Sequence, residues 1–327
     1  MVILPDENKP RIDEETGKNI VTDVRLKRII RDYLMNFKSK EIFVREIIYD
    51  EEGHIQDAKL RAKDFVELFG DEKAEEKEII TKFKSGEKIS KKHIEIIKKN
   101  ICQNVVEKAI DTRLFGATIP LAFQQKEITE KISRPIKSSV TLTGPVQFKM
   151  GQSLHRVKLH YIKGTGAFAS EAGKEQKTFR EEWILPYALI CFYGVINENA
   201  AKITHLTEDD VNLLMEALWN GTKNLISRSK MGQMPRFLLR VVYKQKNYHI
   251  GDLDKRIKLV TDEKTDEEVR GIEDYKLDAS GLIETLIKHK DRIEEVIYGK
   301  DGLLKTKPDD FENQLNQEGI NVKLCNF

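Results

Sequence analysis

The spacing of apolar residues changes from one segment of this chain to the next, and this change constrains the fold more than any other feature. In residues 24–37 and 211–225, apolar side chains recur every three or four positions, as along the buried side of an amphipathic helix. Residues 140–148 and 154–162 instead alternate apolar and polar side chains, and residues 237–243 are a short apolar run bounded by turn signals; both patterns are typical of strands. Helices and strands in this mixed order predict an α+β core.

The strand-like segments also predict particular pairings. We expect residues 140–148 and 154–162 to form one hairpin through a turn at 150–152. Residues 184–196 are largely apolar and predict a long central strand. In the acidic C-terminal segment, the only clear prediction is a helix over about 279–298.

Composition and cysteine usage exclude several classes of protein. The 327 residues contain no run of 18 apolar residues, so we expect no membrane-spanning helix and no membrane partner. The first residues, MVILPDENKPRID, lack the features of a secretory signal. Three well-separated cysteines without a C-x-x-C pair argue against a disulfide scaffold or a zinc ribbon and favour the cytoplasm. Residues 50–108 carry 14 acids, 13 bases and helical patterning, which is typical of a helical insertion.

Charges of opposite sign are sorted into different segments. Residues 131–170 and 217–251 each contain seven Lys or Arg and no acidic residue, although 54 of the 327 residues are acidic. Residues 261–327 carry 17 acids against 10 bases. A polyanion-binding protein requires such sorting, because carboxylates close to phosphates would oppose binding. The alternative is that the acidic segment balances these basic windows in space.

The predicted N-terminal helix places several cations opposite its apolar side. Lys27 and Arg31 are four residues apart and therefore neighbours on the helix surface, with Arg28 beside them. They lie in the N-terminal half, where the helix dipole repels cations, so a bound anion would relieve an unfavourable arrangement. Alternatively, Asp23, Asp32 and solvent neutralise this face.

Two loops and one arm supply further candidate contacts to a nucleic acid. The loops combine cations with glycine and neutral donors and contain no carboxylate. Their candidate residues are Lys149, Gln152, Ser153, Arg228, Lys230 and Arg236. The arm is rich in Gly, Ala and Ser, and an aromatic side chain on it could wedge between bases or could instead anchor the arm to the core. Its candidate residues are Phe168, Lys174, Lys177 and Phe179.

Enzyme chemistry has little support in the sequence. No two of the seven histidines are four residues apart, and there is no H-E-x-x-H motif, so we expect no metal site and no cofactor. Ser153 and His155 would share a strand face, but no third group completes a catalytic set. Asp111 could be a general base or a metal ligand, but a structural hydrogen bond or a pairing with Arg113 is the better interpretation.

Three long phrases, in order, carry a resemblance to a known family. They are KPRIDEETGKNIVTDVRLKRIIRDYL, VTLTGPVQFKMGQSLHRVKLHYIKGTGAF and LTEDDVNLLMEALWNGTKNLISRSKMGQMPRFLLRVVY. The chain resembles the repeated backbone subunit of type I CRISPR surveillance complexes (Cascade), in the branch called type I-B, with type I-C relatives. The likeness covers most of residues 8–260 and is weaker in 50–110 and in the acidic segment.

This resemblance implies a modified RNA-recognition-motif (ferredoxin-like) palm with a helical finger insertion and a thumb hairpin. The implied boundaries are 1–49 palm, first part; 50–110 finger; 111–162 palm; 163–183 thumb; 184–260 palm; and 261–327 acidic C-terminal segment. The LKRIIR phrase implies that Lys27 and Arg31 contact the RNA backbone, with Arg28 assisting. Family members usually begin with an apolar strand, and here only the four residues MVIL are available for it.

The implied function is non-catalytic. Copies of such a subunit polymerise along a CRISPR RNA with other Cascade subunits, thumbs displace bases at regular intervals, and target DNA pairs with the segments between them. Two alternatives remain: a metal-dependent endoribonuclease that cuts target RNA, like the related type III backbone subunits, and a general single-stranded RNA-binding protein.

Overall fold

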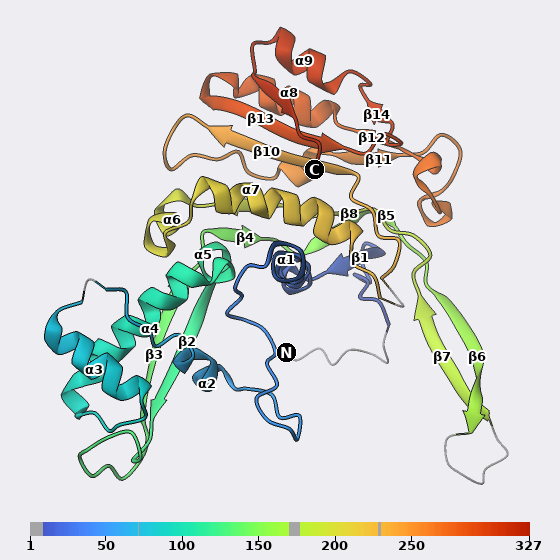
Figure 1. The fold of residues 1–327 in the computed structure, drawn as a ribbon. Helices are drawn as coiled ribbons and strands as arrows, with labels where there is room; N and C mark the ends of the chain where they lie inside the picture. Colours follow the sequence, from blue (N-terminus) through green and yellow to red (C-terminus); the bar gives the residue numbers. More distant parts are fainter. Residues whose placement is uncertain (1–8, 71, 170–176, 228–229) are drawn as a thin grey trace. The chain divides into compact units, whose positions relative to one another are not determined.

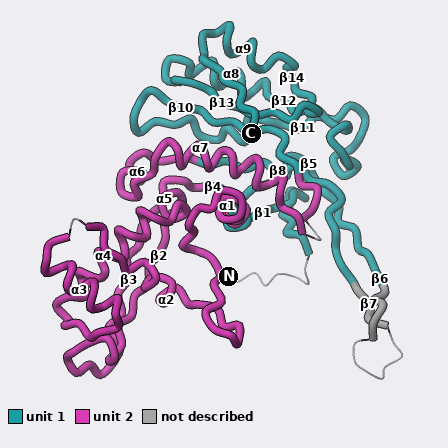
Figure 2. Tube along the Cα trace, in the orientation of Figure 1, with its two compact units in different colours: residues 1–26, 148–194, 234–327 teal, residues 27–147, 195–233 magenta. Residues whose placement is uncertain are grey.

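The computed structural model describes residues 9–70, 72–169, 177–227 and 230–327, and it divides into two compact units (Figures 1 and 2). Both units are discontinuous in sequence. Unit 1 comprises residues 1–26, 148–194 and 234–327, whereas unit 2 comprises residues 27–147 and 195–233. The expectation of a mixed α+β fold is confirmed, because both units contain helices and strands among the described residues. No helix within the described ranges is long and apolar enough to cross a membrane.

Unit 1 contains three three-stranded sheets, and in the first two, distant segments pair. In the first, the central strand β5 pairs with both neighbours, and Gln152 lies opposite Ile20 on one side and Cys191 on the other. Its strands are β1 (Lys18–Val21), β5 (Gly151–Arg156) and β8 (Ile190–Cys191). In the second, two short helices cover a sheet whose central strand β13 pairs antiparallel with β10 and parallel with β15 (Figure 1). These elements are β10 (Phe237–Tyr243), α8 (Ser280–Lys288), β13 (Ile293–Lys300), α9 (Phe311–Gln317) and β15 (Val322–Leu324).

Apolar packing explains the second sheet. Leu282, Leu286, Val296 and Leu315 are completely buried between the helices and the strands. The third sheet is smaller and is bordered by short 3₁₀ turns. These elements are η3 (Leu253–Arg256), β11 (Lys258–Val260), η4 (Asp266–Glu268), η5 (Ile272–Asp274), β12 (Lys276–Asp278), η6 (Lys290–Arg292) and β14 (Thr306–Lys307).

A two-stranded ribbon extends the same unit. It consists of β6 (His160–Ala169) and β7 (Lys177–Ile184), which pair antiparallel from His160 opposite Ile184 onward (Figure 1). Near its base the Tyr161 and Trp183 rings lie 5.0 Å apart. Of the candidate arm residues, Lys174 lies outside the described residues, as do the side chains of Phe168, Lys177 and Phe179.

Unit 2 combines helices with the two-stranded sheet β2–β3. Ile80, Ile97, Ile101, Val105 and Phe123 form the centre of its core, and each is at most 1% exposed. Helix α1 begins in unit 1, and strands β4 and β9 span the boundaries between the units in the sequence. The elements of unit 2 are α1 (Asp23–Lys38), α2 (Ala58–Lys63), α3 (Ala74–Lys84), η1 (Lys91–His93), α4 (Ile94–Lys108), α5 (Ile110–Phe115), β2 (Gly116–Phe123), β3 (Ile136–Thr143), β4 (Val146–Phe148), β9 (Gly194–Ile196), α6 (Glu198–Thr204), α7 (Glu208–Glu216) and η2, a π-helical turn (Ala217–Gly221).

Local signals in the sequence are confirmed in three elements. Helix α1 spans the predicted range, and its apolar side is buried, with Ile30 and Leu34 inaccessible to solvent. Helix α7 begins after Thr207, whose hydroxyl accepts from the N–H of Asp210 in a capping box. Strand β10 coincides with the predicted residues 237–243.

Predictions of pairing and of long elements are wrong in three places. Residues 136–143 pair with β2, and β5 pairs with β1 and β8, so the expected hairpin between 140–148 and 154–162 does not form. Backbone breaks divide 184–196 among β7, β8 and β9. Only the first half of 279–298 is helical, because its second half becomes the central strand β13. The strand that precedes α1 is β1, and MVIL lies outside the described residues.

Candidate nucleic-acid interface

The polar side of α1 carries the cations that the sequence predicted, and each has a different environment. Arg28 is exposed, and its Nε lies 2.7 Å from Oδ1 of Asp32 one turn later. Asp32 therefore neutralises Arg28, as the alternative interpretation of this helix face expected. Lys27 and Arg31 share one aromatic neighbour. The Lys27 Nζ lies 5.8 Å, and the Arg31 guanidinium carbon 5.2 Å, from the ring centre of Phe115. Both cations therefore lie within cation–π distance of the same ring.

Arg31 is anchored through a buried carboxylate. Its Nε donates to Oδ2 of Asp111 at 2.9 Å, and the Asp111 side chain is inaccessible to solvent. The same carboxylate accepts the backbone N–H groups of Phe43 at 2.7 Å and Val44 at 3.1 Å. The structural interpretation of Asp111 is thus confirmed, but its partner is Arg31. Arg113 instead makes two hydrogen bonds, at 2.8 and 2.9 Å, to Asp210.

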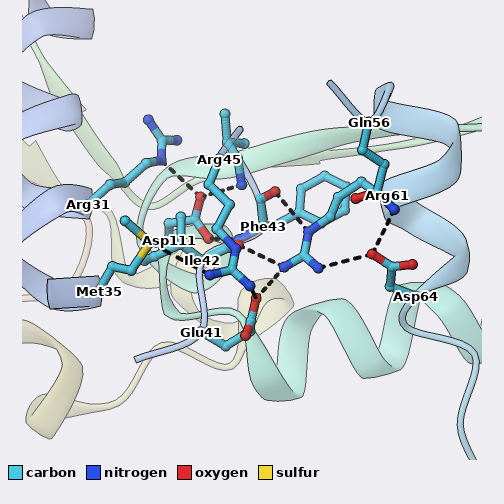
Figure 3. Close-up of polar contacts among 11 residues, drawn as sticks. Arg31, Met35, Glu41, Ile42, Phe43, Arg45, Gln56, Arg61, Asp64 and Asp111 are labelled. Atoms are coloured by element: carbon cyan, nitrogen blue, oxygen red, sulfur yellow. Dashed lines mark hydrogen bonds and ion pairs between the residues drawn. The ribbon is translucent and has the colours of Figure 1, made fainter. Parts of the chain in front are cut away.

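The segment 41–45, between α1 and α2, is held from the opposite side by Arg61. This guanidinium, 8% exposed, donates to the carbonyls of Ile42 at 2.9 Å and Phe43 at 3.4 Å, and it also pairs with Glu41. Figure 3 shows that Asp111 takes the N–H groups of the segment while Arg61 takes its carbonyls. Backbone polar groups that are satisfied in this way fix the course of the segment.

Arg45, at the end of this segment, faces α1. Its Nη2 lies 3.2 Å from Oε1 of Glu41, and its Nη1 contacts the Met35 sulfur at 3.7 Å (Figure 3). A depression of about 160 Å³ separates α1 from the segment. It is lined by Arg28, Arg31, Asp32, Met35, Ile42, Val44, Arg45 and Glu46. Three guanidinium groups and two carboxylates line the depression, and each guanidinium also pairs with an acid: Arg28 with Asp32, Arg31 with Asp111 and Arg45 with Glu41. Its volume can admit a phosphate group.

The unit 1 candidates are more strongly engaged with the protein. Lys149 lies 2.9 Å from Oδ2 of Asp254 and 3.5 Å from Asp252, and the hydrogen bond to Asp254 raises the pKa of Lys149. Gln152 is exposed. Ser153 is buried; its hydroxyl accepts from the backbone N–H of Asn19 and donates to the carbonyl of His155. This hydroxyl serves the sheet and is not available to an RNA oxygen.

Acidic residues of the C-terminal segment balance part of the basic windows, as the alternative interpretation of the charges proposed. Arg236 pairs with Asp301, and both side chains are less than 20% exposed. Arg156 lies 3.3 Å from Glu267. Arg228 lies outside the described residues, whereas Lys230 follows in a turn and is partly exposed.

The structure therefore brings Lys27, Arg28 and Arg31 together within one unit and engages Lys149 and Arg236 with acids in the other. Sequence analysis missed Arg45 and Arg61, because neither belongs to a periodic pattern or an acid-free window.

No catalytic geometry is present at Ser153 and His155. The hydroxyl contacts the backbone of His155, and the imidazole lies 2.9 Å from the carbonyl of Asp266 and 3.3 Å from the N–H of Leu189. Nothing among the residues that the structure describes groups three or more His, Cys, Asp or Glu in a way that could hold a metal ion.

Comparison with known proteins assigns the chain to a family. The profile of the family described as "CRISPR-associated protein Cas7" matches residues 5–280. The "CRISPR-associated protein Cas7" of Haloferax volcanii is 30% identical over 339 residues, covering 97% of this chain and 89% of that protein. Among solved structures, a chain of a "CRISPR RNA-guided surveillance complex, pre-nicking" superposes with a TM-score of 0.48 and 10% identity over 95% of this chain and 96% of that chain. A chain of a "CRISPR RNA-guided surveillance complex" gives 0.37 and 12% over 64% and 77%. The two structural similarities are too low to support an argument, whereas the profile and the sequence relative agree: this chain belongs to the Cas7 family of CRISPR-associated proteins.

Proposed function

We propose that this Cas7-family chain is the repeated, non-catalytic backbone subunit of a type I CRISPR surveillance complex (Cascade) of the I-B branch. Copies of the chain line up along a CRISPR RNA in the cytoplasm, together with the other subunits, and present it to target DNA. The observation that carries the proposal is the depression that Arg28, Arg31 and Arg45 line on α1 and the 41–45 segment. Membership of the family supplies the context.

Cations arranged in this way suit the phosphate backbone of the guide. Contacts with phosphates carry no information about base identity, so the subunit can hold any guide in the same register. Neutralised phosphates release counterions, which makes binding strong at low salt and steeply salt-dependent. Sequence selection is left to base pairing between guide and target, the division of labour known from other RNA-guided systems.

The subdomain boundaries implied by the resemblance are part of the proposal. Helices α2, α3 and α4 support a helical finger over residues 50–110. The β6–β7 ribbon supports a thumb over residues 163–183. The remaining segments up to residue 260 form the palm in this assignment.

The double variant Lys27→Gln/Arg28→Gln tests the proposal. Arg31 is left in place, because its bond to buried Asp111 also serves the fold. We expect weaker binding of labelled single-stranded RNAs of every sequence, and a slope of log affinity against log salt that is smaller by about 1.4, for two lost phosphate contacts. The matched control Lys82→Gln/Lys98→Gln removes the same charge from α3 and α4, where each lysine is paired with a glutamate of its own helix, and should leave the slope unchanged.

Three outcomes would contradict the proposal. An unchanged slope in the Lys27→Gln/Arg28→Gln variant would refute the assigned interface. Cleavage of complementary RNA in Mg²⁺, abolished by replacing one aspartate, would favour the endoribonuclease alternative. Co-purified RNA of mixed length without a CRISPR-repeat sequence would favour the general single-strand binder.

A further inference from the structure

Asp111 is the most deeply buried carboxylate next to the candidate interface. Its side chain is inaccessible to solvent and accepts three hydrogen bonds, two from the backbone of the 41–45 segment and one from Arg31. A buried carboxylate without partners would be strongly unfavourable, so these three donors are required where the residue lies. The residue therefore links the basic helix, the segment and α5 through a single functional group.

The two terminal nitrogens of the Arg31 guanidinium face away from this carboxylate (Figure 3). The bond to Asp111 uses Nε, and the two terminal nitrogens make no hydrogen bond or ion pair with another side chain in the part of the chain that the structure describes (Figure 3). The ring of Phe115 lies 5.2 Å from the guanidinium and limits its rotation further. A guanidinium fixed along one edge keeps its other donors oriented, so less entropy is lost when a phosphate binds.

The same carboxylate also determines where Arg45 lies. Oδ1 and Oδ2 accept the N–H groups of Phe43 and Val44, the two residues that precede Arg45 in the chain. Ile42 and Phe43 are buried, which restricts the course of the backbone up to Arg45. Arg31 and Arg45, which line one depression, are thus both held by Asp111.

We propose that Asp111 is a positioning residue for RNA: it holds Arg31, and through the 41–45 segment Arg45, in the orientation that receives a guide phosphate. This inference rests on the proposed function. It assigns to Asp111 no contact with RNA, since the carboxylate is buried and would repel a phosphate. Its effect on binding passes through Arg31 and Arg45.

The variant Asp111→Asn tests the inference. An asparagine oxygen can still accept the N–H of Phe43, but the amide nitrogen cannot accept from Arg31 or Val44. We expect binding of a fluorescein-labelled single-stranded RNA of mixed sequence to weaken about tenfold, the equivalent of one charge-assisted hydrogen bond. The salt slope should fall by about 0.7, the value of one phosphate contact with a single strand.

A double-mutant cycle separates positioning from general stability. In the Arg31→Ala background, adding Asp111→Asn should weaken RNA binding clearly less than the tenfold expected in the wild type, since only Arg45 is left to be positioned. The matched control Asp210→Asn alters another buried aspartate–arginine pair of the same unit that does not line the depression; it should lower stability but not the salt slope.

A second variant keeps the inference testable if Asp111→Asn does not fold. Arg31→Lys preserves charge but loses the planar fork, so we expect a loss of RNA affinity of several-fold with the buried carboxylate intact. Wild-type affinity in Arg31→Lys, or equal effects of Asp111→Asn with and without Arg31, would overturn the positioning role. If Lys27→Gln/Arg28→Gln also leaves binding unchanged, the proposed function fails instead; if that variant weakens binding, only the positioning inference fails.

Discussion

The buried pair between Arg113 and Asp210 makes the acid stability of unit 2 predictable. Asp210 is only 7% exposed and accepts two hydrogen bonds from the guanidinium, as well as the N–H of Thr207. Burial raises the pKa of Asp210, but the hydrogen bonds from Arg113 and Thr207 outweigh it, so that the pKa is lowered overall from 3.8. The charged form is therefore favoured in the folded protein more than in the unfolded chain.

The sign of the pH dependence follows from this lowered pKa. At any pH above the unfolded value of 3.8, the pair contributes its full stability, and the contribution is lost as the pH falls through the lower folded pKa. In Asp210→Asn the neutral amide keeps one acceptor for Arg113 and the cap of α7, but it loses the charge. We expect a cost of about 2–3 kcal/mol at pH 7, the value of hydrogen bonds to charged groups.

Urea unfolding measured by tryptophan fluorescence would test this prediction. The chain has two tryptophans, and a Trp183→Phe background leaves Trp219 of unit 2 as the reporter. The difference in unfolding free energy between the parent and Asp210→Asn should be constant between pH 5 and 8 and shrink toward pH 3. A difference that is the same at pH 3 and pH 7 would show that the carboxylate charge does not stabilise unit 2.

Two further predictions concern a thiol and a glycine. Burial raises the pKa of the Cys191 thiol to about 11, so Cys191 should react with Ellman's reagent at pH 8 much more slowly in the native protein than after unfolding. Equal labelling rates of this cysteine in the native and the unfolded protein would contradict the raised pKa. Gly116, at φ +69°, leaves no room for a side chain, since a Cβ there would lie 2.1 Å from the carbonyl oxygen of Leu142. Gly86, at φ +84°, has open space around the same position and serves as the control. Gly116→Ala should cost about 3 kcal/mol or more in unfolding free energy and Gly86→Ala only about 1 kcal/mol, and equal costs in thermal or urea unfolding would refute the steric argument.

The parts of the fold that could be predicted from sequence are those fixed by neighbouring residues. The apolar stripe of α1 and the capping box at Thr207 specify their helices within one or two turns, and both are present. Strand pairing depends instead on partners far away in the chain. β3 pairs with β2, whose short sequence GATIPLAF gave no alternation strong enough to identify it beforehand.

The candidate site shows the same limit. The cations of α1 were identifiable because they repeat on one face of a helix. The bond between Arg31 and Asp111 joins residues 80 positions apart, so spacing pointed to the nearer Arg113 instead. Likewise, Arg236 lay in an acid-free window of the sequence, yet its partner Asp301 comes from the acidic segment 65 residues later. Net charge along a chain does not determine net charge in space.

The discontinuous makeup of the two units has a consequence for the order in which they can form during translation. All of unit 2 precedes residue 234, so its core is complete once that point has emerged from the ribosome. Unit 1 begins with the N-terminal segment, but its strand β10 finds its partner β13 only after about residue 300 has been made. Strand β10 must therefore stay unpaired until β13 has been made, whereas the β1–β5–β8 sheet has all of its strands once residue 191 has been made.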